Sequence, residues 1–293
     1  MFYIDPSFTT KKINKALKEQ REITFIRGKY KLTECLILHS DTTITCEDGV
    51  TFERHHKGRM LQTLADENTT KYNGVHNVWW CGGVFKADTN ETPANVITLF
   101  HAIGITLEKV NILCCRGYHS IEINACKGVT IRECFIIGQS SKPGEDFREA
   151  IQIDFANYDG LKIKGAKNTA KCYDNTHCCN ISVIDTEIVD CPNGFGTHSV
   201  SFKEDYHKKI ELKNVKFRNI KGKEIQLFGV DGFELDKVKS ETSIYIIPSR
   251  IHVGTKTKGH PTTGGKKLLT DAKGSVITPR RNKNIRIENT VID

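Results

Sequence analysis

A short pattern recurs along the whole chain and restricts the folds that are open to it. Three residues alternate apolar, polar and apolar, usually after Asn or Gly, so each copy has the two-residue period of a β-strand. Two intervals between copies are 52 residues long and hold either an additional turn or one turn with a long insertion. The copies are Ile44-Thr45-Cys46, Val78-Trp79-Trp80, Ile105-Thr106-Leu107, Val129-Thr130-Ile131, Ile181-Ser182-Val183, Ile210-Glu211-Leu212, Phe233-Glu234-Leu235 and Ile285-Arg286-Ile287.

Two further brief strands accompany most copies. An apolar pair follows, as in Val110 and Ile112, and another alternating segment lies eight residues upstream, as in Ile121-Glu122-Ile123. Strands this short cannot bury their apolar sides alone, but they can do so by winding one coil onto the next. The pattern therefore predicts an all-β parallel β-helix with an interior of stacked aliphatic and aromatic side chains.

The repeat favours one solenoid domain over residues 1–293, with loop insertions at 139–148, 157–177 and 254–275. The cap over residues 1–22 contains the one segment with a helical pattern, where Thr9 or Thr10 precedes Ile13, Ala16 and Leu17 on one side. We expect this helix to cover the open end of the first coil.

The opening helix, the G-K-Y-K-L segment at 28–32 and the N-V or G-V-T-I repeats resemble the pectin lyase-like superfamily over nearly the whole chain. The resemblance implies a single-stranded right-handed parallel β-helix. Within the superfamily, the chain is similar to polygalacturonase-like proteins and to phage tail-associated polysaccharide depolymerases. A phage tail origin would be consistent with a trimer and with a protein that is virion-associated or released.

Composition excludes several other classes of protein. No run of about 18 apolar residues is present, and the first 40 residues lack the order of a secretion signal, so we expect synthesis in the cytoplasm. Eleven cysteines without a C-x-x-C pair indicate buried thiols, such as Cys126 and Cys178, which fall at matching places in successive coils. The net charge of +8 suggests an anionic partner, such as an acidic polysaccharide.

Stacked coils should align outward residues of the upstream strands in columns about 4.8 Å apart. One column would hold Glu122 and Gln152, and the next Asn124 and Asp154, with Ser201 and Lys203 in the following coil. His119, Glu149 and His198 lie just ahead of these strands, with Asn95 and Lys223 in the flanking coils. Polar side chains on an outer sheet face are expected in any case, but this grouping favours a functional groove.

Carboxyl pairs of this kind suit glycoside hydrolysis, which needs one protonated carboxyl and one carboxylate. Glu122 and Asp154 should have backbones roughly 8 Å apart, which falls within the inverting range of about 6.5–9.5 Å. We interpret Asp154, Glu149 and Glu122 as the leading catalytic carboxyls, with His198 as their partner. The predicted substrate-binding residues are His119, Asn124, Gln152, Lys203, Tyr158 and Tyr173.

Two other functions stay open. A polysaccharide lyase would use His198, His119 or Lys203 against a uronate, and a Ca²⁺ ion would have to be bound by Glu122, Asn124, Glu149 and Asp154. A non-catalytic spike would grip a glycan with aromatic side chains. The G-F-G-T-H-S segment around His198 is similar to the G-H-G segment of polygalacturonases, whose N-T-D and D-D segments have no counterpart. We expect no metal cofactor and no membrane partner. A nucleic-acid partner is not expected either, since no basic stripe interleaved with aromatics is present.

Overall fold

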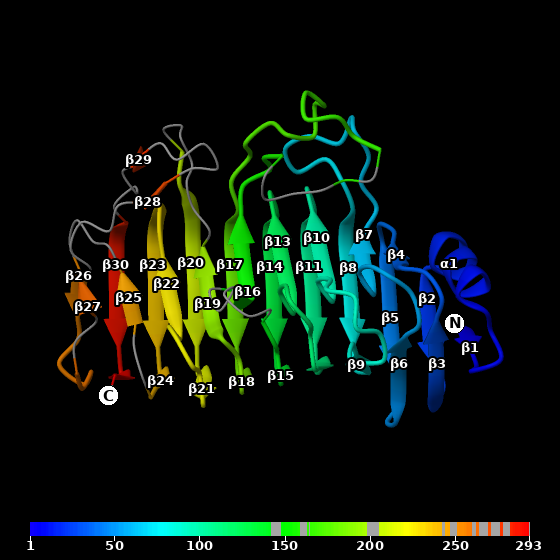
Figure 1. Cartoon of the computed structure of the whole chain (residues 1–293), viewed down its shortest axis with the longest axis horizontal. Coiled ribbons are helices and arrows are strands. Elements are labelled where there is room, and N and C mark those ends of the chain that lie inside the picture. The colour runs from blue at the N-terminus through cyan, green and yellow to red at the C-terminus, as the bar shows by residue number, and fades with distance from the viewer. Residues whose placement is uncertain are drawn as a thin grey trace.

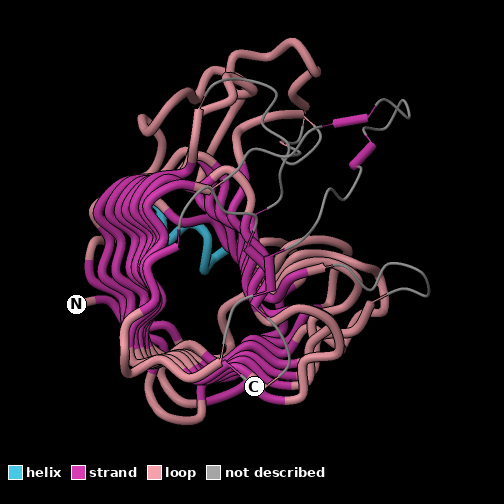
Figure 2. The backbone as a smooth tube through the Cα atoms, turned by 90° about the vertical axis from the view of Figure 1, so that its left-hand side faces the viewer, coloured by secondary structure: helices cyan, strands magenta, loops and turns pink. Residues whose placement is uncertain are grey.

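The computed structural model describes residues 1–141, 148–158, 163, 165–197, 205–241, 244–246, 251–259, 262–263, 269–270, 276–277 and 282–292. Short parallel strands wind into a right-handed β-helix whose three walls are parallel sheets (Figures 1 and 2). The predicted fold is confirmed. No helix among the described residues is long and apolar enough to cross a membrane.

Each wall is one sheet, and neighbouring strands in the wall come from successive coils. Sheet A contains, in spatial order, β1 (Phe2–Ile4), β2 (Glu22–Phe25), β5 (Thr42–Cys46), β8 (His76–Cys81), β11 (Ile103–Glu108), β14 (Lys127–Arg132), β17 (Cys179–Ile184), β20 (His207–Lys213), β23 (Val230–Asp236), β30 (Lys283–Glu288) and β26 (Ile251–Val253). Sheet B contains β3 (Gly28–Leu32), β6 (Val50–Arg54), β9 (Val84–Lys86), β12 (Asn111–Leu113), β15 (Phe135–Ile137), β18 (Glu187–Val189), β21 (Lys216–Arg218), β24 (Lys239–Ser240) and β31 (Val291–Ile292). Sheet C contains β4 (Leu36–Leu38), β7 (Leu61–Thr63), β10 (Ile97–Phe100), β13 (Ile121–Asn124), β16 (Glu149–Asp154), β19 (Asn193–Thr197), β22 (Ile225–Leu227), β25 (Ile244–Ile246) and β27 (Thr262–Thr263). Strands β28 (Leu269–Thr270) and β29 (Val276–Ile277) form a separate antiparallel pair.

The corners between the walls are made by residues in the left-handed backbone region. Between sheets A and B this residue is Lys109, Glu133, Asp185 or Asn214 in successive coils, all with φ between 49° and 53°. Asn tolerates this conformation well, and its side chain also bonds the next coil, as when Asn214 Nδ2 donates to Asp185 Oδ1 at 2.6 Å. A single left-handed residue thus turns a short strand into the next wall without a long loop.

The interior is a continuous apolar stack, because every second residue of each strand faces inward. Cys126 and Cys178 lie in this stack in neighbouring coils, where Cys126 N donates to Cys178 Sγ at 3.4 Å. All eleven cysteines are free thiols, and burial raises the pKa of Cys126 to about 12. Cys126 and Cys178 are therefore packing groups, as the sequence predicts.

Helix α1 (Thr10–Glu19) closes the N-terminal end of the interior (Figure 2). Thr9 is its N-cap and accepts a hydrogen bond from Lys12 N, while Ile13, Ala16 and Leu17 face the core. Asn14 Nδ2 donates to Cys35 O at 2.8 Å, and Asn14 Oδ1 accepts from Ile37 N at 2.9 Å. The helix thereby pairs backbone groups at the first edge of sheet C, which would otherwise be open.

The two long intervals of the repeat have different origins. Strand β14 pairs directly with β17, so the first interval is one turn with insertions. In the second interval the chain passes through β24 and β25 to β26, and then returns to place β30 between β23 and β26. The second interval is therefore neither an additional turn in sequence order nor a single turn with a long insertion. Strand β30 comes after β26 in the sequence, but it lies between β23 and β26 in sheet A.

Candidate active site

The predicted polar columns lie on the outer face of sheet C. The strand register places Glu122 between Thr98 and Gln152, and Asn124 between Phe100 and Asp154. The intervening residues of these strands, such as Ile121 and Ile123, belong to the interior stack. Glu122 and Asp154 are therefore diagonal neighbours, one strand and two residues apart, with backbones roughly 8 Å apart. We call Glu122, Asp154, Glu149, His119, Asn124 and Gln152 the carboxyl site.

The expectation of an open groove is wrong, because the carboxyl site is almost completely buried. Exposed fractions are 4% for Glu122, 2% for Asp154 and 2% for Glu149. His119, Asn124 and Gln152 are buried to the same degree, although their side chains lie on the outer side of sheet C. The two-residue period predicts which side of the sheet a side chain lies on. It does not predict whether other parts of the chain cover that side.

A row of six polar residues lies at the start of the sheet C strands, each two residues ahead of a paired core residue. The row is Arg59, Asn95, His119, Glu149, Asn193 and Lys223. Asn95 Oδ1 accepts from His119 N at 2.9 Å, and Asn193 Oδ1 accepts from Lys223 N at 2.6 Å. The two asparagines therefore fix the spacing of neighbouring coils at the start of sheet C.

Glu122 is the carboxyl whose protonation the surroundings change most clearly. Removal from solvent raises its pKa to about 7, against the favourable field of Arg59, which lowers it, while the Asp154 charge raises it. Asn95 Nδ2 donates a hydrogen bond to Glu122 Oε2, so the side chain has a fixed position. A carboxyl that keeps its proton near neutral pH, beside a second carboxyl, has the properties of a general acid.

His119 and Glu149 form a second polar contact in the site. His119 Nδ1 lies 2.7 Å from the Glu149 carbonyl oxygen and 3.9 Å from its Oε2 atom. A carbonyl oxygen only accepts hydrogen bonds, so Nδ1 carries a proton and the ring orientation is fixed. The Glu149 side chain extends toward β19, where an ideal Cβ on Gly196 would lie 2.6 Å from Glu149 Cγ.

Replacing Gly196 by Ala should therefore destabilise the fold by about 1–3 kcal/mol, because the new methyl group overlaps the Glu149 side chain. Urea unfolding measures this cost. In a Glu149→Ala background the same substitution should cost much less, since the obstructing side chain is gone. An equal cost in the two backgrounds would show that Glu149 does not occupy the space over Gly196.

The strand of the coil that follows Asp154 begins earlier in the sequence than the alternating segment 200–202 predicts. The strand beside β16 is β19 (Asn193–Thr197), which places Asn193 in the row and Gly196 next to Gln152. Phe195 decides this register, because it fills the interior between Ile151 and Ile225. His198, Ser201 and Lys203 lie outside the described residues.

Tyr158 and Tyr173 lie in the loop between β16 and β17, at the edge of the carboxyl site. Their rings meet edge to face at 5.3 Å between centroids. Tyr173 packs against an apolar cluster that contains Phe100, which stands beside Asn124 in the register, and Tyr158 is 41% exposed. This loop joins the loop at 64–75 through Cys172 N, which donates to Glu67 O at 3.1 Å, and both loops project from the same side of the solenoid (Figure 1).

The sequence interpretation missed two members of the row, Arg59 and Asn193. Arg59 lies near Glu122, and its guanidinium stacks over Phe100 at 5.0 Å from the ring centre. Arg59 and Asn193 are each two residues ahead of a strand core residue, which is the offset that already identified His119 and Glu149. Extending that offset to every coil would have found both. In the described part of the chain no group of three or more His, Cys, Asp or Glu side chains can hold a metal ion.

No protein-family model matches the chain, and no curated protein is similar to it in sequence. Solved structures share its fold. The surface adhesin PfbA of Streptococcus pneumoniae superposes with a TM-score of 0.63 at 16% identity, over 97% of this chain and 70% of the adhesin. The ORF18 protein of Geobacillus virus E2 gives 0.61 at 10% identity, over 90% and 56% of the two chains.

A family 28 exopolygalacturonase of Yersinia enterocolitica superposes with a TM-score of 0.60 at 10% identity, over the whole of this chain and 66% of the enzyme. The chain thus has the right-handed parallel β-helix fold of these structures. At these identities the similarity establishes the architecture and leaves the chemistry to the site itself.

Proposed function

We propose that the protein degrades a polysaccharide by glycoside hydrolysis at the carboxyl site. The single observation that carries this proposal is the raised pKa of Glu122, about 7, beside the Asp154 carboxyl. Glu122 would protonate the departing glycosidic oxygen, and Asp154 would activate the attacking water. Their backbones lie roughly 8 Å apart on neighbouring strands, so both carboxyl groups could act on one glycosidic bond.

The fold supports the same substrate class. An exopolygalacturonase is among the solved structures with this architecture, and a phage protein is another. Arg59, Asn95 and Lys223 would bind substrate oxygens along the row, and Tyr158 would stack on a sugar ring. Because the carboxyl site is buried, the substrate must displace some of the side chains that cover it before the carboxyls can act.

Product analysis tests the proposal and separates it from a lyase. The protein is incubated with neutral and acidic polysaccharides, and new reducing ends and the absorbance of unsaturated sugars are measured together. Hydrolysis produces reducing ends without the absorbance, whereas β-elimination produces both. Unsaturated products would reject hydrolysis in favour of elimination. If neither signal appeared with any polysaccharide, both enzyme activities would be rejected.

A non-catalytic glycan-binding function is the second candidate. The burial of Glu122 and Asp154 favours it, since an enzyme needs access to these groups, and an adhesin shares the fold. Retention of a polysaccharide without any cleavage, by the wild-type protein at pH 5–8, would support this alternative.

A further inference from the structure

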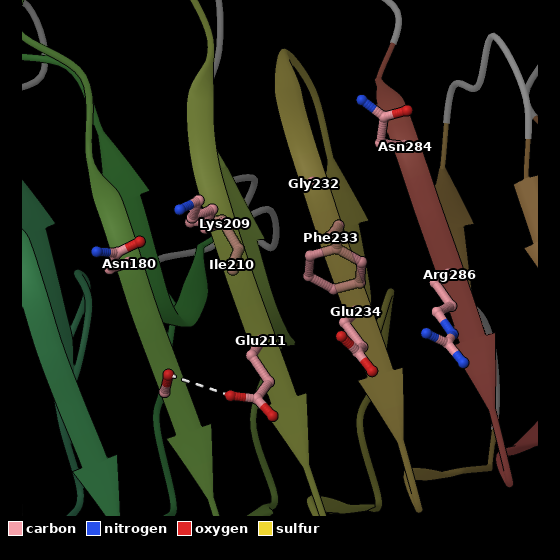
Figure 3. A pocket seen from close by; sticks show the side chains of 10 residues that line it. Asn180, Lys209, Ile210, Glu211, Gly232, Phe233, Glu234, Asn284 and Arg286 are labelled. Atoms are coloured by element: carbon pink, nitrogen blue, oxygen red, sulfur yellow. Dashed lines mark hydrogen bonds between the residues drawn. The ribbon is translucent and has the colours of Figure 1, made fainter.

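A shallow hollow of about 520 Å³ lies on the outer face of sheet A, on a different wall from the carboxyl site. Figure 3 shows its lining on four neighbouring strands, β17, β20, β23 and β30. Asn180, Lys209, Gly232 and Asn284 form one row across these strands, and they are all in the left-handed backbone region, so the sheet bends there. The second row of outward side chains is Ser182, Glu211, Glu234 and Arg286.

The second row belongs to a longer column that follows the solenoid axis. Its register continues through Thr130 and Thr106 to Trp79 on β8. Unlike the carboxyl site, every member of this column has solvent access, and Trp79 is 39% exposed. Trp79 Nε1 donates a hydrogen bond to Glu108 Oε2 at 2.8 Å, and Arg132 Nη2 donates to the same oxygen at 2.7 Å. The exposed indole therefore has a fixed orientation, which is the property of an aromatic platform for a sugar ring.

Two features of the hollow oppose folding stability. Glu211 and Glu234 lie directly opposite each other on neighbouring strands, an arrangement that is destabilising for like charges. Ser182 Oγ donates to Glu211 Oε2 at 3.3 Å, but within the described residues Glu234 has no hydrogen-bond or ion-pair partner. Arg286 contacts Glu288 through Nε at 3.2 Å rather than Glu234.

Lys209 is the second such feature. It has a φ of 54° where neighbouring coils have Gly or Asn, and its ammonium group also has no partner in the described part of the chain. A β-sheet surface selected for stability alone would pair these charges or replace them. The unpaired groups instead line a concavity, where they are available to a ligand.

The geometry points to a glycan-holding site in this hollow, for a neutral, hydroxyl-rich polysaccharide segment lying along the solenoid axis. Carboxylates accept hydrogen bonds from sugar hydroxyls, while Lys209, Arg286 and Asn180 donate to sugar oxygens. The two acids and two bases leave the hollow without net charge, so an acidic polymer gains nothing there. The inference uses the substrate class of the proposed function but does not depend on its chemistry.

Glycan retention tests the site. Cellohexaose, mannohexaose and maltohexaose are the neutral probes, and hexagalacturonate is the acidic one, each measured by calorimetry with the full chain. The wild type should bind at least one neutral probe, and Glu211→Gln/Glu234→Gln should weaken that binding about tenfold or more. The matched control Glu19→Gln/Glu133→Gln also removes two exposed carboxylates, outside the hollow, and should bind as the wild type does.

Folding and location are checked separately. The Glu211→Gln/Glu234→Gln protein should unfold at the same temperature as the wild type or higher, since it loses a like-charge pair. Asp154→Asn should retain the binding, so a failure of hydrolysis leaves this site standing. Binding that is unchanged in the hollow variant, confined to hexagalacturonate, lost in Asp154→Asn, or absent for all probes would overturn the inference.

Discussion

Replacing Asp154 by Asn should reduce cleavage of the preferred polysaccharide by roughly 10²–10⁴-fold, the range expected when a general base is lost. Asp154 Oδ1 accepts a hydrogen bond from Phe155 N at 2.7 Å, and Asn keeps an oxygen that can do the same. The variant should therefore fold normally and still bind glycan. Initial rates of reducing-end release, compared with calorimetric binding, measure the two effects separately.

A control variant removes the same charge elsewhere. Asp185 lies at an exposed corner between sheets A and B, in the left-handed region that Asn tolerates, and it accepts a hydrogen bond from Asn214. Asp185→Asn should keep the wild-type rate. If Asp154→Asn cleaves as fast as Asp185→Asn, Asp154 has no part in the reaction.

Replacing Glu122 by Gln should change the pH dependence of stability by on the order of 3 kcal/mol. The folded protein holds the Glu122 proton up to a pKa of about 7, whereas the unfolded chain releases it near 4.5. Between these values the folded state binds more protons, so ionisation of Glu122 lowers the free energy of unfolding as the pH rises from about 4.5 to about 7. Gln resembles the protonated acid and removes this loss.

Urea unfolding of the two proteins from pH 4 to pH 8 measures the effect. At pH 4 their difference in unfolding free energy should be small, and it should increase in favour of Glu122→Gln until about pH 7. The Glu133→Gln variant removes a carboxylate from the exposed surface and is measured beside them as the control. Parallel curves for Glu122→Gln would show that Glu122 titrates normally in the folded protein.

The sequence predicted the column register of the site well, because coil stacking converts a two-residue period directly into neighbours. Glu122 beside Gln152, and Asn124 beside Asp154, follow from that rule, as does the pairing of Cys126 with Cys178. The helix at Thr10–Glu19 was equally clear, since a cap residue and an apolar face define it locally.

Three features could not be predicted in the same way. The segment around Phe195 and the segment 200–202 both have the two-residue period of a strand. Only the packing of Phe195 between Ile151 and Ile225 selects the first segment as the strand of this coil. The insertion of β30 between β23 and β26 depends on pairing between strands that are distant in the sequence. The burial of Glu122 depends on contacts from Asn95 and other coils, which no local pattern encodes.

The protonation of Glu122 is the most direct test of the proposed chemistry. Carbon-13 NMR of the side-chain carboxyl, assigned by comparison with Glu122→Gln, follows its ionisation in the native protein. A midpoint near pH 7 is the predicted result. Glu122 would then keep its proton in a large part of the molecules near neutral pH and could donate it to a leaving group. A midpoint near 4.5 would mean that Glu122 is an ordinary carboxylate, and the hydrolytic assignment of the site would be wrong.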